Sequence, residues 1–196
     1  NSRQLVVTFS EQVKSSSLDL TKFHVNDATG TDAPLTNLSG ASVTAATSTA
    51  ITITLTEAQR ASLIQESGVT GGDGAAVVLD VDANGVKDIG KNNNSLDDNN
   101  TVTETADTNV PTISSIATGS GQTTQVSFTE SVVVVFSESM STGSVSNSTS
   151  PNLGITWTVS WGTATTTATY TPVGNLPGNT TITFTLSSAQ DLATNA

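Results

Sequence analysis

The sequence predicts an all-β protein made of two antiparallel β-sandwich domains. Ser and Thr make up about a third of the 196 residues and aromatic residues only 4%, a profile typical of secreted β-rich proteins. Short stretches alternate apolar with polar residues, which is the pattern of a strand with one buried face. Two sequence landmarks also recur in the same order, and this predicts a repeat of domain size.

The first half of the chain carries strand signals and one helix signal. Thr56 and Gln59 have the spacing of a capping box, so a short helix is expected after Thr56, with Gly68 as its stop. The apolar run at 76–81 predicts a buried strand that leads into an acidic loop. Strands are expected at residues 5–9, 22–26, 51–55 and 76–81.

The second half reads as a second domain. Residues 92–100 are nearly all Asn, Asp and Ser, which predicts a segment too polar to pack, and we place the domain boundary near Asp107. The predicted domains are therefore 1–106 and 107–196. Trp157 and Trp161 share one face of a strand and are expected in the core. Strands are expected at residues 132–136, 155–161, 168–172 and 182–186.

The repeat consists of two landmarks in each domain. The first is Val-Val-Thr-Phe-Ser-Glu at 6–11 and Val-Val-Val-Phe-Ser-Glu at 133–138. The second is Asp-Ile-Gly-Lys-Asn at 88–92 and Asp-Leu-Ala-Thr-Asn at 191–195. The landmarks lie farther apart in the first domain, so that domain is expected to carry an insertion comprising the short helix and the Gly-rich turn after it.

At these residues the sequence resembles the bacterial and archaeal immunoglobulin-like domains that occur in tandem in surface-layer proteins and large adhesins. The resemblance rests on an Asp-x-x-x-Pro-Thr linker at 107–112, the two Phe-Ser-Glu strands and the two Asp-Ile/Leu turns. It implies immunoglobulin-like sandwiches, a cell-surface location and a scaffold or adhesive role. The first domain departs from this pattern because it lacks the linker and the opening strand.

Charge and composition exclude several classes of partner. The net charge is −11 and all six Lys and Arg precede Asn92, so a nucleic-acid or anionic-membrane surface is not expected, whereas divalent cations are plausible ligands. The chain has no cysteine, hence no disulfide and no thiol site. No apolar run reaches membrane-spanning length, and we expect any signal peptide or anchor to lie outside this segment.

The acidic loop has the spacing of a calcium site. Its side-chain oxygens and one carbonyl follow the order of an EF-hand front, with Gly85 permitting the sharp turn. Lys91 stands where an EF-hand has Glu, so further ligands must come from elsewhere. The alternative is an ordinary hairpin turn with exposed acids. The candidate calcium ligands are Asp80, Asp82, Asn84, Val86 and Asp88, supplemented by Asp97, Asp98 and Asp107.

No arrangement of residues predicts catalysis. Glu11 and Glu138 end equivalent strands but belong to different domains, so they cannot flank one substrate, and a structural role is favoured. His24 has no nucleophile motif near it and reads as a surface or cross-strand histidine. Trp157, Trp161 and Tyr170 could stack on sugars, although their alternation favours the core. Possible glycan sites are the sequons at Asn37, Asn93, Asn99, Asn147 and Asn179.

The leading hypothesis is a non-catalytic structural module of an extracellular surface layer or surface filament. A ligand-binding or carbohydrate-binding adhesin module is the alternative, and a non-catalytic module of a secreted enzyme is the third. The missing opening strand predicts an unpaired sheet edge in the first domain. Such an edge could be filled by upstream residues or by another copy, and either would produce a repeating array.

Overall fold

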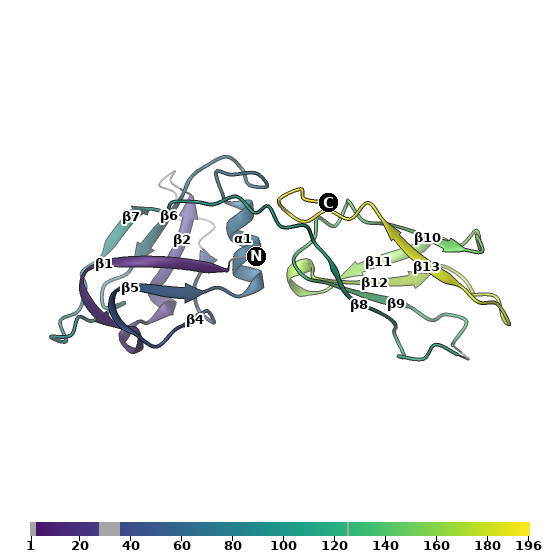
Figure 1. Ribbon diagram of the computed structural model, residues 1–196, viewed down its shortest axis with the longest axis horizontal. Helices are drawn as coiled ribbons and strands as arrows, with labels where there is room; N and C mark the ends of the chain where they lie inside the picture. Colours follow the sequence, from purple (N-terminus) through teal and green to yellow (C-terminus); the bar gives the residue numbers. More distant parts are fainter. Residues whose placement is uncertain (1–2, 28–35, 125) are drawn as a thin grey trace. The chain divides into compact units, whose positions relative to one another are not determined.

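The computed structural model describes residues 3–27, 36–124 and 126–196, and it divides into two compact units, 1–107 and 108–196 (Figure 1). The predicted boundary lay one residue earlier. Antiparallel strands dominate both units, which confirms the all-β sandwich class. Single turns of 3-10 helix lie at Ser15–Ser17, Leu20–Lys22 and Thr163–Thr165.

The first unit consists of two sheets and one helix. One sheet has the order β1-β5-β4 and the other β3-β2-β6-β7, with antiparallel pairing throughout. Phe23, Leu38, Ile51 and Ile53 are almost fully buried in the core between them. The elements are β1 (Gln4–Lys14), β2 (Phe23–Asp27), β3 (Thr36–Asn37), β4 (Ser42–Val43), β5 (Thr47–Thr54), α1 (Glu57–Gln65), β6 (Val77–Val81) and β7 (Asp97–Thr101).

Helix α1 is the predicted insertion, and its capping box is present. The Thr56 hydroxyl accepts from the Gln59 N–H at 3.2 Å, and the Gln59 side chain accepts from the Thr56 N–H at 2.9 Å. The Gln59 amide also donates to the carbonyls of Asn37 and Ser39, both at 2.9 Å, which ties the helix to the strand region beside it. The helix ends at Gln65, before the predicted stop at Gly68.

The second unit has a four-stranded sheet of order β11-β12-β9-β8 and a two-stranded sheet of β10 and β13. Tyr170, Val134 and Met140 are fully buried. Trp157 and Trp161 pack on this core as predicted, Trp161 stacking on Phe136 at 6.0 Å. The strands are β8 (Ile113–Thr118), β9 (Val132–Phe136), β10 (Ser146–Ser150), β11 (Trp157–Trp161), β12 (Thr167–Pro172) and β13 (Thr183–Ser187).

The polar segment that follows the acidic loop corrects one prediction. Residues 92–100 were expected to be too polar to pack, yet β7 begins at Asp97 and pairs with β6. Its ladder uses backbone N–H and C=O groups, so an edge strand with exposed side chains needs no apolar residue. The Asn100 amide donates to the Leu79 carbonyl at 3.1 Å and reinforces the pairing.

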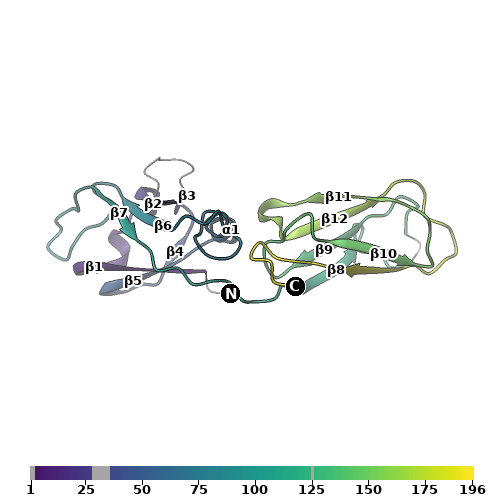
Figure 2. The same ribbon diagram turned by 90° about the horizontal axis from the view of Figure 1, so that it is seen from above.

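The two units differ in how their sheets end. In the second unit β9 lies between β12 and β8 (Figure 2). In the first unit the equivalent strand β1 has β5 as its one ladder partner among the residues that the structure describes, so no counterpart of β8 lies on its other edge within those residues. Within the same described residues, β13 pairs with β10 alone.

Candidate functional site

The repeated Asp-x-x-x-Asn landmark forms the same hydrogen-bonded turn in both units. The Asp88 carboxylate accepts from the backbone N–H and the side-chain amide of Asn92, both at 2.7 Å. The Asp191 carboxylate accepts from the corresponding groups of Asn195 at 2.8 and 2.9 Å. The fourth residue after Asp is therefore constrained because it supplies two donors to one carboxylate.

Each turn lies beside the end of the repeated Val-rich stretch. An isolated antiparallel bridge joins Val13 to Asp88 in the first unit and Met140 to Asp191 in the second. Val13 and Met140 each stand two residues after the Glu of Phe-Ser-Glu. The two landmarks are thus one local structure, and in the second unit this structure brings the region of Glu138 next to Asp191.

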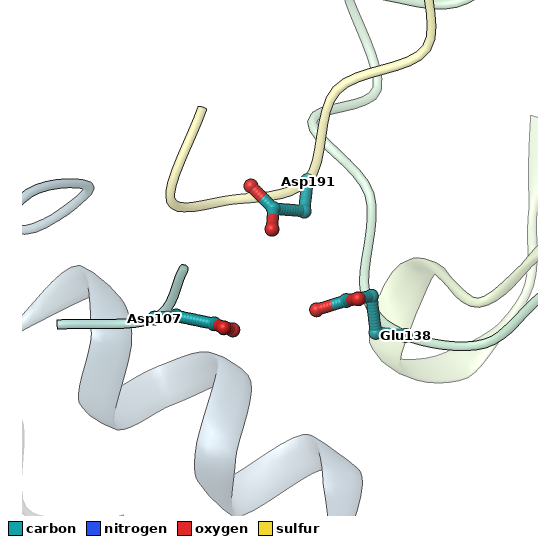
Figure 3. Close-up of side chains that lie close together, drawn as sticks. All are labelled: Asp107, Glu138 and Asp191. Atoms are coloured by element: carbon teal, nitrogen blue, oxygen red, sulfur yellow. The ribbon is translucent and has the colours of Figure 1, made fainter. Parts of the chain in front are cut away.

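Three motif acids gather at this point. One carboxylate oxygen each from Asp107, Glu138 and Asp191 lies within 4.8 Å of the others, and Figure 3 shows their side chains pointing into a common space. We call these residues the acid group. Glu138 is 2% exposed and Asp191 1%. Carboxylates this close and this buried repel one another unless protons or cations lie among them.

Asp107 and the linker that follows it form specific hydrogen bonds. In the first unit its carboxylate accepts from the Arg60 guanidinium at 2.8 Å, which offsets one negative charge. Five residues later, the Thr112 N–H donates to the Ser137 hydroxyl at 2.9 Å, and the Ser137 N–H donates to the Thr112 carbonyl at 2.8 Å. Ser137 precedes Glu138, so these bonds connect the 107–112 linker directly to the Phe-Ser-Glu segment.

The corresponding acids of the first unit are more exposed to solvent. Glu11 is exposed and Asp88 is partly exposed. Hydrogen bonds from the side chain and then the backbone of Asn92 lower the pKa of Asp88 below its usual value. The same two motifs therefore carry buried acids in the second unit and solvent-accessible acids in the first.

Asn26 and Asn94 form hydrogen bonds with residues of the predicted calcium site. Asp80 accepts from the Asn26 side chain at 2.8 Å, and Asp82 lies 3.2 Å from the ring of His24. Asn94 lies across the loop, since its side-chain oxygen accepts from the Val86 N–H and its backbone carbonyl accepts from the Asn84 N–H. Asn84 adopts the left-handed conformation (φ 65°) of a tight turn.

The predicted ligands fall in several places. Asp80 lies on β6, Asp82, Asn84, Val86 and Asp88 follow in the loop, Asp97 and Asp98 lie exposed on β7, and Asp107 belongs to the acid group. Within the described parts of the chain, the acid group is the one set of three acidic, His or Cys side chains whose ligand atoms converge. Calcium binding by the loop, which would also use amide and carbonyl oxygens, stays a prediction.

Sequence reasoning missed Glu138 and Asp191 as candidate ligands. Glu138 was assigned a structural role, and Asp191 was used only as a repeat landmark. The signal was available, because the linker, the Phe-Ser-Glu strand and the Asp-Leu turn each contribute one acid. What the sequence lacked was the tertiary contact that brings the three together.

The comparisons with known proteins bear on this same segment. Residues 107–196 match the family described as the bacterial Ig-like domain. The match begins at Asp107 and includes Glu138 and Asp191, so all three members of the acid group lie inside it. No curated protein matches the chain. In the described residues no helix is long and apolar enough to cross a membrane.

Proposed function

We propose that this chain is a non-catalytic structural module of an extracellular cell-surface protein, and that it assembles into a surface layer or surface filament. Bacterial Ig-like domains are structural or adhesive modules of this general kind, and the second unit matches them. The observation that carries the proposal is the edge of β1 opposite β5. Among the described residues this edge has no ladder partner apart from the single bridge from Val13 to Asp88, so it offers N–H and C=O groups to another chain.

The surroundings of β1 suit an added strand. A hollow of about 720 Å³ in the first unit is lined by residues 4–10 of β1 and by residues of β6 and β7. Val6 is 59% exposed on the outer face of β1 and also lines this hollow. In the second unit β8 occupies the matching edge of β9 and shows what kind of element covers it.

We assign the occupant to β13 of a second copy. Among described residues β13 also has one open side, and a hollow of about 340 Å³ beside it is lined by Phe136, Leu186 and Ala189. Pairing β1 of one copy with β13 of the next uses two different edges, so the contact is head-to-tail and can continue into a filament.

The test uses sedimentation velocity over a range of protein concentrations. A lysine on an edge strand disfavours strand addition, so Val6→Lys and Thr185→Lys should each reduce assembly. An equimolar mixture of the two variants should still form dimers, because each variant keeps one intact edge. Val159→Lys, on edge strand β11, is the matched control and should assemble like the unchanged protein. A monomer at every concentration would refute the proposal.

We further propose calcium as the ligand of this module, with the acid group as its first candidate and the Asp80 loop as its second. Buried carboxylates need a counter-charge, and calcium prefers oxygen ligands. Binding to the folded state alone raises stability by RT ln(1 + [L]/Kd). Both tryptophans lie in the second unit, so their fluorescence reports the melting of that unit.

The calcium experiment compares melting in calcium with melting in chelator. Glu138→Gln should abolish the calcium-dependent rise in Tm of the second unit if the acid group binds the ion. Asp82→Asn should leave that rise unchanged and serves as the control for the loop. Equal Tm values with calcium and with chelator would show that neither site stabilises the fold.

We also propose that the Asn-x-Ser/Thr sequons are glycosylated. Asn93, Asn99 and Asn179 are exposed. Asn147 is half-buried on β10, and the amide of Asn37 already donates to the Thr21 carbonyl at 2.6 Å. Expression in a glycosylating host followed by intact-mass spectrometry should therefore find glycans at the three exposed sequons before the other two.

A further inference from the structure

The second unit contains a cavity that shares Phe184 of β13 with the strand proposed to take part in assembly. Its volume is about 490 Å³, within the range of ligand pockets, roughly 300–1,000 Å³. It lies between the loop that leads into β9 and the loop that joins β12 to β13, with the start of β11 beneath. None of the proposed metal ligands lines it.

The aromatic part of the cavity is held by the sandwich itself. Trp157, the first residue of β11, pairs with Pro172 of β12, and its ring meets that of Phe184 edge-on at 5.2 Å. Phe184 in turn contacts Tyr170, which is fully buried, at 5.0 Å. Trp157 is only partly buried, so one ring is fixed by the core and still lines the cavity.

The two loops that form the walls are tied together. The Leu176 N–H donates to the Phe128 carbonyl at 2.7 Å. Leu176 is 7% exposed, whereas the Phe128 side chain is 59% exposed and also lines the cavity. Phe128 and Trp157 thus both line the cavity, and aromatic lining with a few polar groups is typical of ligand pockets.

The rest of the lining mixes aliphatic side chains with polar groups that are almost all uncharged. Hydroxyl and amide groups come from Thr118, Ser127, Asn179 and Thr181, all able to donate and accept hydrogen bonds. Glu130 is the one charged side chain in the lining, and residues 108–196 contain no Lys or Arg. Hydrogen bonds from the backbone and side chain of Ser120 lower the pKa of Glu130, so it is ionised at neutral pH. An anionic ligand is therefore disfavoured.

We propose that this cavity binds a neutral saccharide, with a sugar ring packed against Trp157 and Phe128 and its hydroxyls bonded to the Thr, Ser and Asn groups of the rim. The apolar C–H face of a sugar ring complements the negative face of an aromatic ring, and its hydroxyls match uncharged donors and acceptors. Every residue of the lining belongs to the second unit, so the proposed binding needs no second copy of the chain.

The experiment measures binding to three neutral probes, maltotriose, cellotriose and chitotriose, by isothermal titration calorimetry on the full chain. At least one is expected to bind at millimolar concentration or below. Phe128→Ala changes an exposed side chain and should weaken binding about tenfold or more, whereas Trp161→Phe, on the same strand but outside the cavity, should leave it unchanged. In the Trp161→Phe variant Trp157 is the sole tryptophan, and its emission should shift on binding.

Three outcomes would overturn the proposal. They are the absence of binding by all three saccharides, binding that survives both Phe128→Ala and Trp157→Phe, and binding of choline in preference to every saccharide. The last result would assign the cavity to a cation, because aromatic rings beside a carboxylate also suit quaternary ammonium groups. Normal tryptophan-detected unfolding of Phe128→Ala would show that a loss of binding is not a loss of fold.

Discussion

The two units contain the same pair of landmarks, yet the environment of those landmarks differs. In the first unit Glu11 is exposed and the edge of β1 is open, whereas in the second Glu138 is 2% exposed and β8 covers β9. The Asp-x-x-x-Asn turn has the same hydrogen bonds in both. A short motif therefore specifies a local turn, and neighbouring elements decide whether its acids are solvated surface groups or a buried charged cluster.

The largest expected effect concerns the residues that bridge to the two turns. Met140 is fully buried, and Met140→Ala should destabilise the second unit by about 2–5 kcal/mol, because it leaves a cavity in the core. Val13→Ala removes fewer atoms and should cost the first unit about 2 kcal/mol. Urea unfolding followed by tryptophan fluorescence measures the second unit, and hydrogen exchange measures the first. Equal losses would show that the two bridges are equivalent in packing.

The next effect concerns the turns themselves. Asp191→Ala removes a buried carboxylate that accepts from the N–H and amide of the partly buried Asn195, and should cost about 1–3 kcal/mol in calcium. Asp88→Ala should cost less than about 1 kcal/mol, because water can replace the carboxylate at a partly exposed turn. Urea titrations of both variants, read as above, measure the difference. A larger loss for Asp88→Ala would contradict the contrast between buried and solvated turns.

A smaller effect tests the element that only the first unit has. Thr56→Ala removes one half of the capping box of α1 and should destabilise the first unit by about 1 kcal/mol. Ser62→Ala, within the same helix, is the control and should cost nothing, since Ala favours a helix. Hydrogen exchange of α1 and β3 provides the measurement. Unchanged tryptophan-detected unfolding should show that the effect stays within the first unit.

The smallest effect is a difference in pH dependence. Burial raises the pKa of Glu66 above its ordinary value of 4.5. Folding then favours its protonated form, so its contribution to the stability of the first unit is present below about pH 4.5 and is lost as the pH rises through the folded-state pKa. Glu66→Gln should remove this loss and raise the Tm of the first unit at neutral pH.

Glu130 in the second unit should behave in the opposite way. Its pKa is lowered by hydrogen bonds from Ser120, so its contribution is present above the ordinary value of 4.5 and is lost as the pH falls through the folded-state pKa. Glu130→Gln should remove that loss. Melting curves of both variants between pH 3 and pH 7 give the comparison, and slopes of the same sign for the two residues would contradict it.

The sequence by itself determined the elements that local chemistry controls. Alternation of apolar residues places the β5 and β12 strands, the capping box places α1, and the paired landmarks reveal the repeat. These signals are readable because each depends on residues within a few positions of one another.

Only the tertiary structure decided the features that depend on distant contacts. Strand β7 forms because the backbone of β6 offers it a ladder, although its side chains are Asp, Asn and Thr. Trp157 lies on the core as its periodicity predicts, yet the loops around it leave part of its ring facing a cavity. Asp107, Glu138 and Asp191 meet because three segments far apart in the chain end at one place. Burial and electrostatic interaction depend on that meeting in space, which no spacing along the chain encodes.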